Sequence, residues 1–487
     1  MSDITRLGVT ELSKLLQTKD LSAREAAQSY LSRMEKAEPQ IGAFLTVTKE
    51  EAIVAAEDID RRRMAGESLP PLAGVPMGIK DNICTKGIKT TCASRILSNF
   101  EPAYDATAYR KMKEAGCVLL GKMNMDEFAM GSSTENSSVK ITRNPRDITC
   151  VPGGSSGGAA AAVAANEAPF TLGSDTGGSI RQPASFCGVV GMKPTYGSVS
   201  RYGLIAFASS LDQIGPLTKT VADSALVLNA LCGHDSKDST SVHREYTDNT
   251  LEMQKGVKGL RIAVPREFFG EGLHASVKSA VEKAAAFYAS RGAELIEVSL
   301  PTLKYALPAY YVISSAEASS NLARFDGVRY GYRAEEYEDL NDLYIKTRSQ
   351  GFGPEVKRRI MLGTFTLSAG YFDAYYKKAL QVRTRIMEEF SNIFASCQAV
   401  LSPVAPTTAY RIGEKTQNPL EMYLGDIYTV PVSIAGLPAL SVPCGADDTG
   451  LPIGMQLTGR PFSEPLLYRI ANAYEQENKH VFGEVTL

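Results

Sequence analysis

Three serines set among glycines are the residues of this sequence best suited to do chemistry. Ser155 and Ser156 lie in GGSSGG and Ser179 lies in DTGGSIR, within the stretch from Val151 to Ala184. Glycine lets a backbone turn tightly or come very close to a ligand. Two such clusters on either side of an alanine-rich segment predict a site built from backbone, with hydroxyl groups directed into it. A pair of ordinary Gly/Ser turns is the alternative, and spacing alone does not decide between the two.

A serine hydroxyl attacks a carbonyl only when another group accepts its proton. The usual base is histidine, but the histidines lie far apart and outside every glycine-rich segment: His234, His243, His274 and His480. Lys80 follows the apolar run GVPMGI, so we expect its side chain to start in a partly buried setting, although a solvated surface lysine is the commoner case. Burial lowers a lysine pKa from about 10.4, and a neutral lysine can act as the base. Ser155 or Ser156 would then relay the proton.

The DTGGSI segment also offers hydrogen-bond donors. Two glycines directly before a serine allow consecutive N–H groups to converge on one point. We expect the backbone amides of Thr176, Gly177, Gly178 and Ser179 to hold the negative oxygen of a tetrahedral intermediate. The segment therefore predicts an oxyanion hole next to the nucleophile.

The overall composition excludes several classes of protein. The chain has 487 residues and a formal charge of −2, whereas a protein that grips nucleic acid by itself usually carries a basic excess. Any polynucleotide would have to be held mainly by another chain. The eight cysteines form no CxxC pair and no secretory leader is recognisable, which predicts reduced thiols in a cytoplasmic protein. We expect no membrane span, since no stretch approaches about 20 apolar residues, and no metal site, since no histidine pair has ligand spacing.

One segment imitates a nucleotide-binding loop. Gly116-CVLL-Gly121-Lys122 matches most of a phosphate-loop pattern, but Met123 stands where the Ser or Thr that meets magnesium is required. The four residues between the glycines are typical of a strand rather than of a loop with free N–H groups. The sequence therefore argues against a nucleotide site here.

The first part of the chain predicts helices and strands in alternation. Residues 1–65 are mostly helical, with capping boxes at Ser22–Glu25 and Thr48–Glu51 and a strand at 42–48 between the two helices. The apolar run 71–87 leads to a helix that begins at Asp105 and ends at residue 116, then to a strand and to a polar loop at 125–137. This order is typical of an α/β fold.

The second part continues the pattern. A buried strand at 188–194 precedes a helix at 221–233 and a surface loop at 234–250, and strand, helix (about 275–291) and strand then form a parallel unit. Residues 327–370 form a charged, tyrosine-rich excursion that favours a lid or partner surface, with a solvated helical pair as the alternative. A helix at about 372–395, three strands and a closing helix complete a single domain, 1–487, with a mostly continuous mixed sheet.

Three motifs together identify a family. GIKDN contains Lys80, PGGSSGG contains Ser155, and GSDTGGSIRQPA contains Ser179, in this order and with the two serines 24 residues apart. This combination resembles the amidase signature family, whose members use a Ser–cis-Ser–Lys triad. The resemblance implies Ser179 as nucleophile, Ser155 as bridging hydroxyl after a cis peptide bond, and Lys80 as base. It also implies an α/β fold with a large central mixed sheet covered by helices on both faces.

Further segments resemble one branch of that family, the glutaminase subunits of tRNA-dependent amidotransferases. They are KMNMDEFAMGSSTENS, GYRAEEYEDL, EVKRRIMLGTF and MYLGDIYTVPVSIAGLPALSVPCG. The resemblance implies that this chain hydrolyses glutamine and passes ammonia to a separate B subunit, which activates Glu-tRNA(Gln) with ATP and magnesium, with Asp-tRNA(Asn) as a second candidate substrate. A small C subunit would join the two in a heterotrimer. No cofactor is expected in this chain.

The same resemblance assigns substrate-binding residues. Arg359 would hold the α-carboxylate of glutamine and Asp426 its α-amino group, with Tyr310 and Ser132 as pocket neighbours. The chemistry is suitable, because an arginine fork matches a carboxylate and an aspartate attracts an ammonium. Without the resemblance, Arg359 in KRRI would be assigned as a solvated helix residue.

Two other functions remain as alternatives. A stand-alone amidase acting on another small amide would not need both Arg359 and Asp426. A catalytically silent scaffold would not need the intact Lys80, Ser155 and Ser179.

Overall fold

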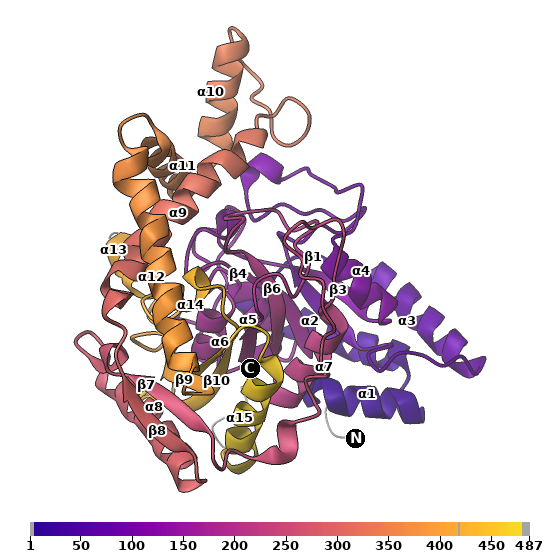
Figure 1. Ribbon diagram of the computed structural model, residues 1–487. Helices are drawn as coiled ribbons and strands as arrows, with labels where there is room; N and C mark the ends of the chain where they lie inside the picture. The colour runs from indigo at the N-terminus through magenta and orange to yellow at the C-terminus, as the bar shows by residue number, and fades with distance from the viewer. Residues whose placement is uncertain (1–3, 417–418, 480–487) are drawn as a thin grey trace.

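The computed structural model describes residues 4–416 and 419–479 (Figure 1). Within these ranges, eleven strands form one mixed sheet in the order β1-β3-β2-β4-β6-β5-β10-β11-β9-β7-β8, covered by helices on both faces. The predicted fold class is confirmed. The strands are β1 (Phe44–Val47), β2 (Pro76–Lys80), β3 (Val118–Met123), β4 (Phe170–Asp175), β5 (Val190–Lys193), β6 (Gln213–Thr218), β7 (Arg261–Pro265), β8 (Glu294–Val298), β9 (Ala399–Pro403), β10 (Ala439–Ala446) and β11 (Pro452–Gly459).

Strand direction divides the sheet into two parallel groups and an antiparallel middle, with β1 as an antiparallel edge strand beside β3. The strands β3, β2 and β4 run parallel, as do β9, β7 and β8 at the far end, and the neighbours between these groups are antiparallel. The predicted strand–helix–strand unit is present as β7, α8 (Ala275–Ser290) and β8. The strands β2 and β4 are fully buried, as expected for parallel strands covered on both faces, although each ends in polar residues, Lys80 in β2 and Ser174 and Asp175 in β4.

The N-terminal helices are α1 (Val9–Thr18), α2 (Ala23–Ile41) and α3 (Lys49–Met64). The capping box before α2 is confirmed, because the Glu25 amide donates to Ser22 Oγ at 3.1 Å and the Ser22 amide donates to the Glu25 carboxylate at 2.9 Å. The box predicted at Thr48–Glu51 is wrong. The Thr48 hydroxyl donates instead to the Leu119 carbonyl at 2.9 Å, since Thr48 lies beside β3 and that buried carbonyl needs a donor.

The predicted start of the helix at Asp105 is wrong. Helix α4 (Thr107–Glu114) is capped by Ala106 and not by Asp105, whose carboxylate accepts from the Lys86 amide at 2.7 Å and pairs with Lys113. The false phosphate loop is strand β3, as expected. Its Lys122 is fully buried and lies 3.3 Å from the Asp81 carboxylate.

The predicted polar loop at 125–137 is largely buried rather than solvated. It contains a short 3₁₀ turn, η3 (Glu127–Ala129), and the Asp126 carboxylate accepts from the amides of Thr134 and Asn136. Carboxylates that bond backbone amides can be buried, which the polarity of the segment alone did not indicate.

The remaining helices surround the central strands. They are α5 (Gly157–Ala164), α6 (Arg181–Cys187), α7 (Val221–Leu231), α9 (Ala306–Asn321), α10 (Leu340–Gly351), α11 (Pro354–Leu367), α12 (Lys377–Phe394), α13 (Pro419–Leu424), α14 (Val430–Ile434) and α15 (Glu464–Glu477). Helix α10 projects from the body at the top of Figure 1, whereas α11 and α12 pack against α9. The long helix expected at 372–395 opens with a π-helical turn, Phe372–Tyr376, before α12.

All eight cysteines are free thiols, as expected. In the part of the chain that the structure describes, no helix has both the length and the apolar character needed to cross a bilayer. The histidines need a correction: the rings of His234 and His243 lie 4.9 Å apart, because the loop between them folds back, while His480 lies outside the described residues.

Candidate active site

The segments that carry the predicted triad residues meet at one edge of the sheet. Lys80 is the last residue of β2, and the loop with Ser179 follows β4 directly. The two strands are parallel neighbours, with Gly78 opposite Thr171, so their carboxyl ends reach the same edge, where α/β sheets commonly bind ligands. Helix α5 begins just after Ser156 and contacts both strands, which brings the second serine cluster to this edge.

Lys80 is completely buried among hydroxyl and carbonyl oxygens. Its Nζ donates to Ser155 Oγ at 2.7 Å, to Ser156 Oγ at 2.8 Å and to the Ser174 carbonyl at 3.2 Å. Burial lowers the pKa of the amine to about 7, although the carboxylates of nearby aspartates oppose the change. The neutral amine is therefore well populated at neutral pH, which is the property that a base requires.

The hydrogen bonds distinguish Ser155 from Ser156, a choice that residue spacing left open and that the family resemblance made in favour of Ser155. Ser156 Oγ donates to the Ser174 carbonyl at 3.0 Å and accepts from the Ser174 amide at 3.3 Å, so its proton is already used to hold the start of α5 against β4. Ser155 follows a cis peptide bond, Gly154–Ser155, and its Oγ accepts from Lys80. The geometry favours Ser155 as the bridging hydroxyl.

A buried ion pair shapes the Ser179 loop. The Asp175 carboxylate accepts from the amides of Gly178 at 2.9 Å and Ile180 at 3.1 Å, and from Arg181 Nη2 at 2.9 Å. Burial acts to raise the pKa of Asp175, but the charge and hydrogen bonds of Arg181, the Lys193 charge and the Ile180 amide together outweigh it and hold that pKa below its usual range. Since the Ser156 amide also donates to the Ser179 carbonyl at 3.0 Å, the loop is fixed to the other serine cluster.

One of the four predicted oxyanion donors, the Gly178 amide, is already used inside the loop. The Gly178 amide donates to Asp175 Oδ1 and is not directed at an open position, because a carboxylate inside the loop is a strong acceptor. The amides of Thr176, Gly177 and Ser179 remain as candidates. The Thr429 hydroxyl donates to the Gly177 carbonyl at 2.6 Å, which fixes the peptide between the two glycines.

Tyr310 and Ser132 both lie against the triad segments. A Cβ at Gly177 would be 2.6 Å from the Tyr310 hydroxyl oxygen, so the ring is in close contact with the nucleophile loop. A Cβ at Gly154 would be 2.9 Å from the Ser132 carbonyl carbon, and that carbonyl accepts from Gln182 Nε2 at 2.9 Å. Both glycines are required by this close approach.

Arg359 is a buried cation with spare hydrogen-bonding capacity. It lies on α11 with 3% of its side chain exposed, and its Nε donates to Glu355 Oε1 at 2.7 Å. The guanidinium lies over the rings of Tyr311 and Tyr423, at 4.5 and 4.8 Å. Its Nη1 is buried and has no hydrogen-bond partner among the described residues. An unsatisfied buried donor is costly, and a carboxylate ligand would satisfy it. The alternative of a solvated helix residue is wrong.

Asp426 lies near this cation, two residues after α13. Burial raises the pKa of its carboxyl to about 8, and the Arg359 charge opposes that rise. A bound ammonium group would favour the ionised carboxylate. Together the two residues provide a cation and an acidic group within one site.

The sequence did not identify the residues that support the site. Asp175 and Arg181 lie inside the recognised motif GSDTGGSIRQPA, and Glu355 lies four residues before Arg359, a spacing that pairs charges on a helix. Those signals could have been used. Tyr423, whose hydroxyl donates to Glu355 at 2.7 Å, has no signal in a single sequence.

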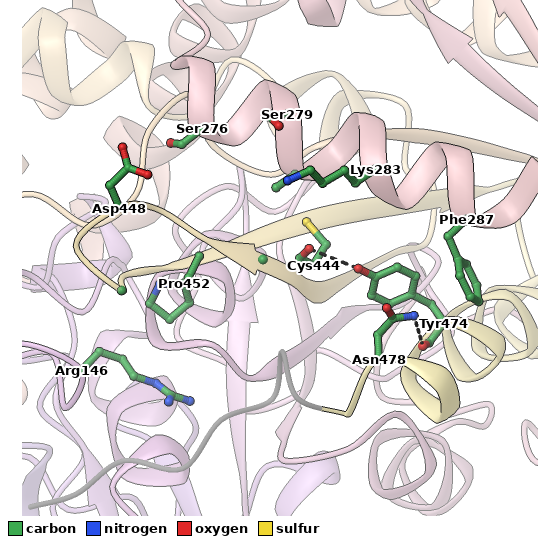
Figure 2. A pocket seen from close by; sticks show the side chains of 14 residues that line it. Arg146, Ser276, Ser279, Lys283, Phe287, Cys444, Asp448, Pro452, Tyr474 and Asn478 are labelled. Carbon is green, nitrogen blue, oxygen red and sulfur yellow. Dashed lines mark hydrogen bonds between the residues drawn. The ribbon is translucent and has the colours of Figure 1, made fainter.

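Two cavities differ in their relation to the site. One of about 210 Å³ is bordered by Ser133, Glu355 and Met422, next to the predicted substrate residues. A larger one, of about 610 Å³, lies between α8, the β10–β11 hairpin and α15 (Figure 2). The predicted site residues line neither cavity, but the smaller one is bordered by Ser133 and Arg358, the sequence neighbours of Ser132 and Arg359.

The site contains hydroxyls, the Lys80 amine, backbone amides, the buried cation of Arg359 and the carboxyl of Asp426. Among residues 4–416 and 419–479, no group of three or more His, Cys, Asp and Glu side chains could hold a metal ion. A neutral amine in contact with a serine hydroxyl is suited to nucleophilic attack on a carbonyl carbon. Acyl transfer is therefore the chemistry that this arrangement fits best.

Comparisons with known proteins also indicate acyl-transfer chemistry, since they identify amidases. The Amidase family model matches residues 25–468. A curated relative from Thermoanaerobacter pseudethanolicus, the A subunit of a glutamyl-tRNA(Gln) amidotransferase, is 57% identical over 98% of this chain and 97% of its own. The crystal structure of the Thermotoga maritima A subunit is 44% identical with a TM-score of 0.83, covering 100% of this chain and 99% of that one. The peptide amidase of Stenotrophomonas maltophilia is 30% identical, with a TM-score of 0.83 and 97% coverage of both chains.

Proposed function

This chain belongs to the amidase family, and we propose that it is the glutamine-hydrolysing A subunit of a glutamyl-tRNA(Gln) amidotransferase. Relatives of that name are similar over nearly their whole length, at 57% identity for one of them. The observation that carries the choice of substrate is the buried Nη1 of Arg359, which lies close to Asp426 and has no hydrogen-bond partner within residues 4–416 and 419–479. An α-amino acid presents the carboxylate and the ammonium that such a pair would bind.

In the first half of the proposed reaction, Ser179 Oγ attacks the side-chain amide carbon of glutamine. Its proton passes to Ser155 Oγ, whose own proton passes to Lys80 Nζ, and the neutral amine becomes an ammonium. The amides of Thr176, Gly177 and Ser179 would stabilise the negative oxygen of the tetrahedral intermediate. The 2.7 Å contact between Lys80 and Ser155 supports this route.

In the second half, the C–N bond breaks and the leaving nitrogen takes the proton back from Lys80 through Ser155. Ammonia leaves, and Ser179 remains bound as a γ-glutamyl ester. Water, deprotonated by the same amine, attacks this ester and releases glutamate with Ser179 restored. Atoms and charges balance without any further reactant.

The proposal extends to the partners. Ammonia would pass to the B subunit, which would hold Glu-tRNA(Gln), with Asp-tRNA(Asn) as a second candidate, and activate it with ATP and magnesium. The C subunit would join the other two. The near-neutral charge of this chain supports a division of labour in which the tRNA is held elsewhere. We propose a cytoplasmic heterotrimer with no cofactor in this chain.

The main test is reconstitution. The chain, co-expressed with its B and C subunits, should convert Glu-tRNA(Gln) to Gln-tRNA(Gln) with glutamine, ATP and magnesium, and should release one glutamate per product. Hydrolysis of simple amides such as butyramide without any use of glutamine would instead support the alternative, a stand-alone amidase.

A further inference from the structure

Glu127 is a buried carboxyl that the proposed reaction does not use. It is 2% exposed and lies in the η3 turn, directly after Asp126. Its Oε1 accepts from the Ser94 hydroxyl, and its Oε2 accepts from the Gly353 amide at 2.8 Å. Gly353 is the residue that caps the start of α11, so the carboxyl is bonded directly to the end of the helix that carries Arg359.

The contact is too close to be incidental. A Cβ at Gly353 would lie 2.3 Å from Glu127 Oε2, so only glycine allows this approach. The neighbouring Phe128 ring packs edge-to-face on Phe352, with centroids 5.6 Å apart. The Ser94 hydroxyl also lies 3.4 Å from the Gly351 carbonyl, at the last residue of α10. Glu127, Ser94 and Phe128 thus fix the junction between α10 and α11.

The residue before Glu127 in the η3 turn region, Asp126, contacts the triad segment. The Asp126 amide donates to the Ser155 carbonyl at 3.3 Å, and the Asp126 carboxylate orders the loop that carries Ser132. Glu127 therefore joins a segment that contacts the bridging serine to the helix that holds the predicted carboxylate-binding arginine. Arg359 lies less than two helical turns from this junction, so a change in the start of α11 displaces its guanidinium.

We infer that Glu127 is a positioning residue, which holds the start of α11 so that Arg359 binds the substrate carboxylate at the correct distance from Ser179. It acts through α11 and does not touch the substrate. The inference rests on the proposed function for the identity of the substrate, but the link between Glu127 and α11 can be tested without any substrate.

The test compares Glu127→Ala with Glu127→Gln in the full-length chain, co-expressed with its partner subunits. In Glu127→Gln the side chain can still accept from the Gly353 amide and can donate to Ser94. Burial also raises the pKa of Glu127 to about 7, so a neutral group is already well populated at this position near neutral pH. Glu101→Ala, at an exposed position, is the control for loss of a carboxylate.

Three readouts separate positioning from a general structural role. Glu127→Ala should raise the KM for glutamine about tenfold, while kcat/KM for butyramide, which has no α-carboxylate, stays within about threefold of wild type. Glu127→Gln should restore the KM for glutamine to within about threefold. Combined with Arg359→Ala, the Glu127→Ala change should add little to the KM, because two changes that act through one contact are not additive.

Hydrogen exchange provides the substrate-free test. Amides of α11 should exchange at least about threefold faster in Glu127→Ala than in wild type, with α5 unaffected. Unchanged exchange in α11 would overturn the inference whatever the substrate is. An equal loss of glutamine and butyramide turnover would also overturn it, since that pattern indicates damage to the triad. If wild type accepts butyramide and not glutamine, the proposed function fails, and the exchange result alone decides the role of Glu127.

Discussion

Lys80 Nζ lies 2.7 Å from Ser155 Oγ, although 75 residues separate them in the chain. The parallel pairing of β2 with β4 and the packing of α5 on both strands bring them together. Because Lys80 is fully buried and its pKa is lowered to about 7, the contact joins a weakly basic amine to a hydroxyl whose own proton can move. The catalytic proposal depends on this relationship.

Ser179→Ala should remove the nucleophile and leave the rest of the site in place. Turnover of glutamine should fall by about 10³-fold or more, the size of effect seen when a catalytic serine is lost. The complex carrying this variant should still amidate Glu-tRNA(Gln) when ammonium chloride replaces glutamine, because only the ammonia supply is lost. Normal glutamine turnover, or failure of ammonia to restore the reaction, would contradict the assignment.

The rate should depend on pH through Lys80. Only the neutral amine accepts a proton, so kcat/KM for butyramide should rise with pH and level off above an apparent pKa of about 7. Butyramide is chosen because it does not use Asp426. Lys80→Arg should be inactive, since a guanidinium stays charged. A flat profile between about pH 6 and 8.5 would exclude this amine as the base.

Arg359→Ala should affect binding more than chemistry. A hydrogen bond to a charged group contributes about 1.5–3 kcal/mol, which corresponds to a KM for glutamine raised roughly 10- to 150-fold. The rate with butyramide should not change. Arg385→Ala is the control, because that arginine is exposed on α12 and pairs with Glu388. An unchanged KM in Arg359→Ala would argue against the carboxylate assignment.

The KM for glutamine should fall as the pH rises from about 6 to about 8. Burial raises the pKa of Asp426 to about 8 in the free protein, so at lower pH its carboxyl is mostly neutral and attracts an ammonium weakly. Binding of the substrate ammonium must then release the proton of the Asp426 carboxyl, and this release becomes easier as the pH approaches the pKa of Asp426. Asp426→Asn should have a high KM that does not vary with pH. The same slope in both proteins would assign the titration to another group.

Lys80 should also carry a stability cost. Its pKa is lowered on folding, so between about pH 7 and pH 10.5 the unfolded chain binds more protons than the folded one, and stability rises with pH across this window. Lys80→Met removes the titration. Urea unfolding should show that wild type gains stability relative to Lys80→Met as the pH rises from about 7 toward 10, and a constant difference would contradict the lowered pKa.

The fold could be predicted from the sequence where local patterns and burial agree. The strand–helix–strand unit at β7–α8–β8 and the capping box at Ser22 were both correct, because the bonds that form there are the local ones: β7 pairs with β8, and Ser22 and Glu25 bond each other. The capping box predicted at Thr48 and the helix start predicted at Asp105 were wrong for one reason. Each side chain found a partner distant in sequence, Leu119 for Thr48 and the Lys86 amide for Asp105, and a single sequence does not show such partners.

The burial of the site could be predicted from the sequence, but most of its hydrogen bonds could not. The apolar run before Lys80 indicated its burial. The choice of Ser155 over Ser156 came from the family resemblance and not from spacing, and the bonds between Ser156 and Ser174 give its physical reason. The Gly178 amide was misassigned because Asp175 accepts from it, a contact set by the shape of the loop. Arg359 was identified through resemblance alone, since its charge in KRRI suggests solvent and not a buried helix face.

The most direct test of the central claim is the titration of the Lys80 side chain. Nuclear magnetic resonance of a protein labelled at its lysine side chains, with the signal assigned by its loss in Lys80→Arg, measures this pKa without any substrate. We predict a value near 7, which makes the amine a usable proton acceptor at physiological pH. A value above about 9, close to that of an ordinary lysine, would mean that the amine stays charged and would contradict the proposed activation of Ser179.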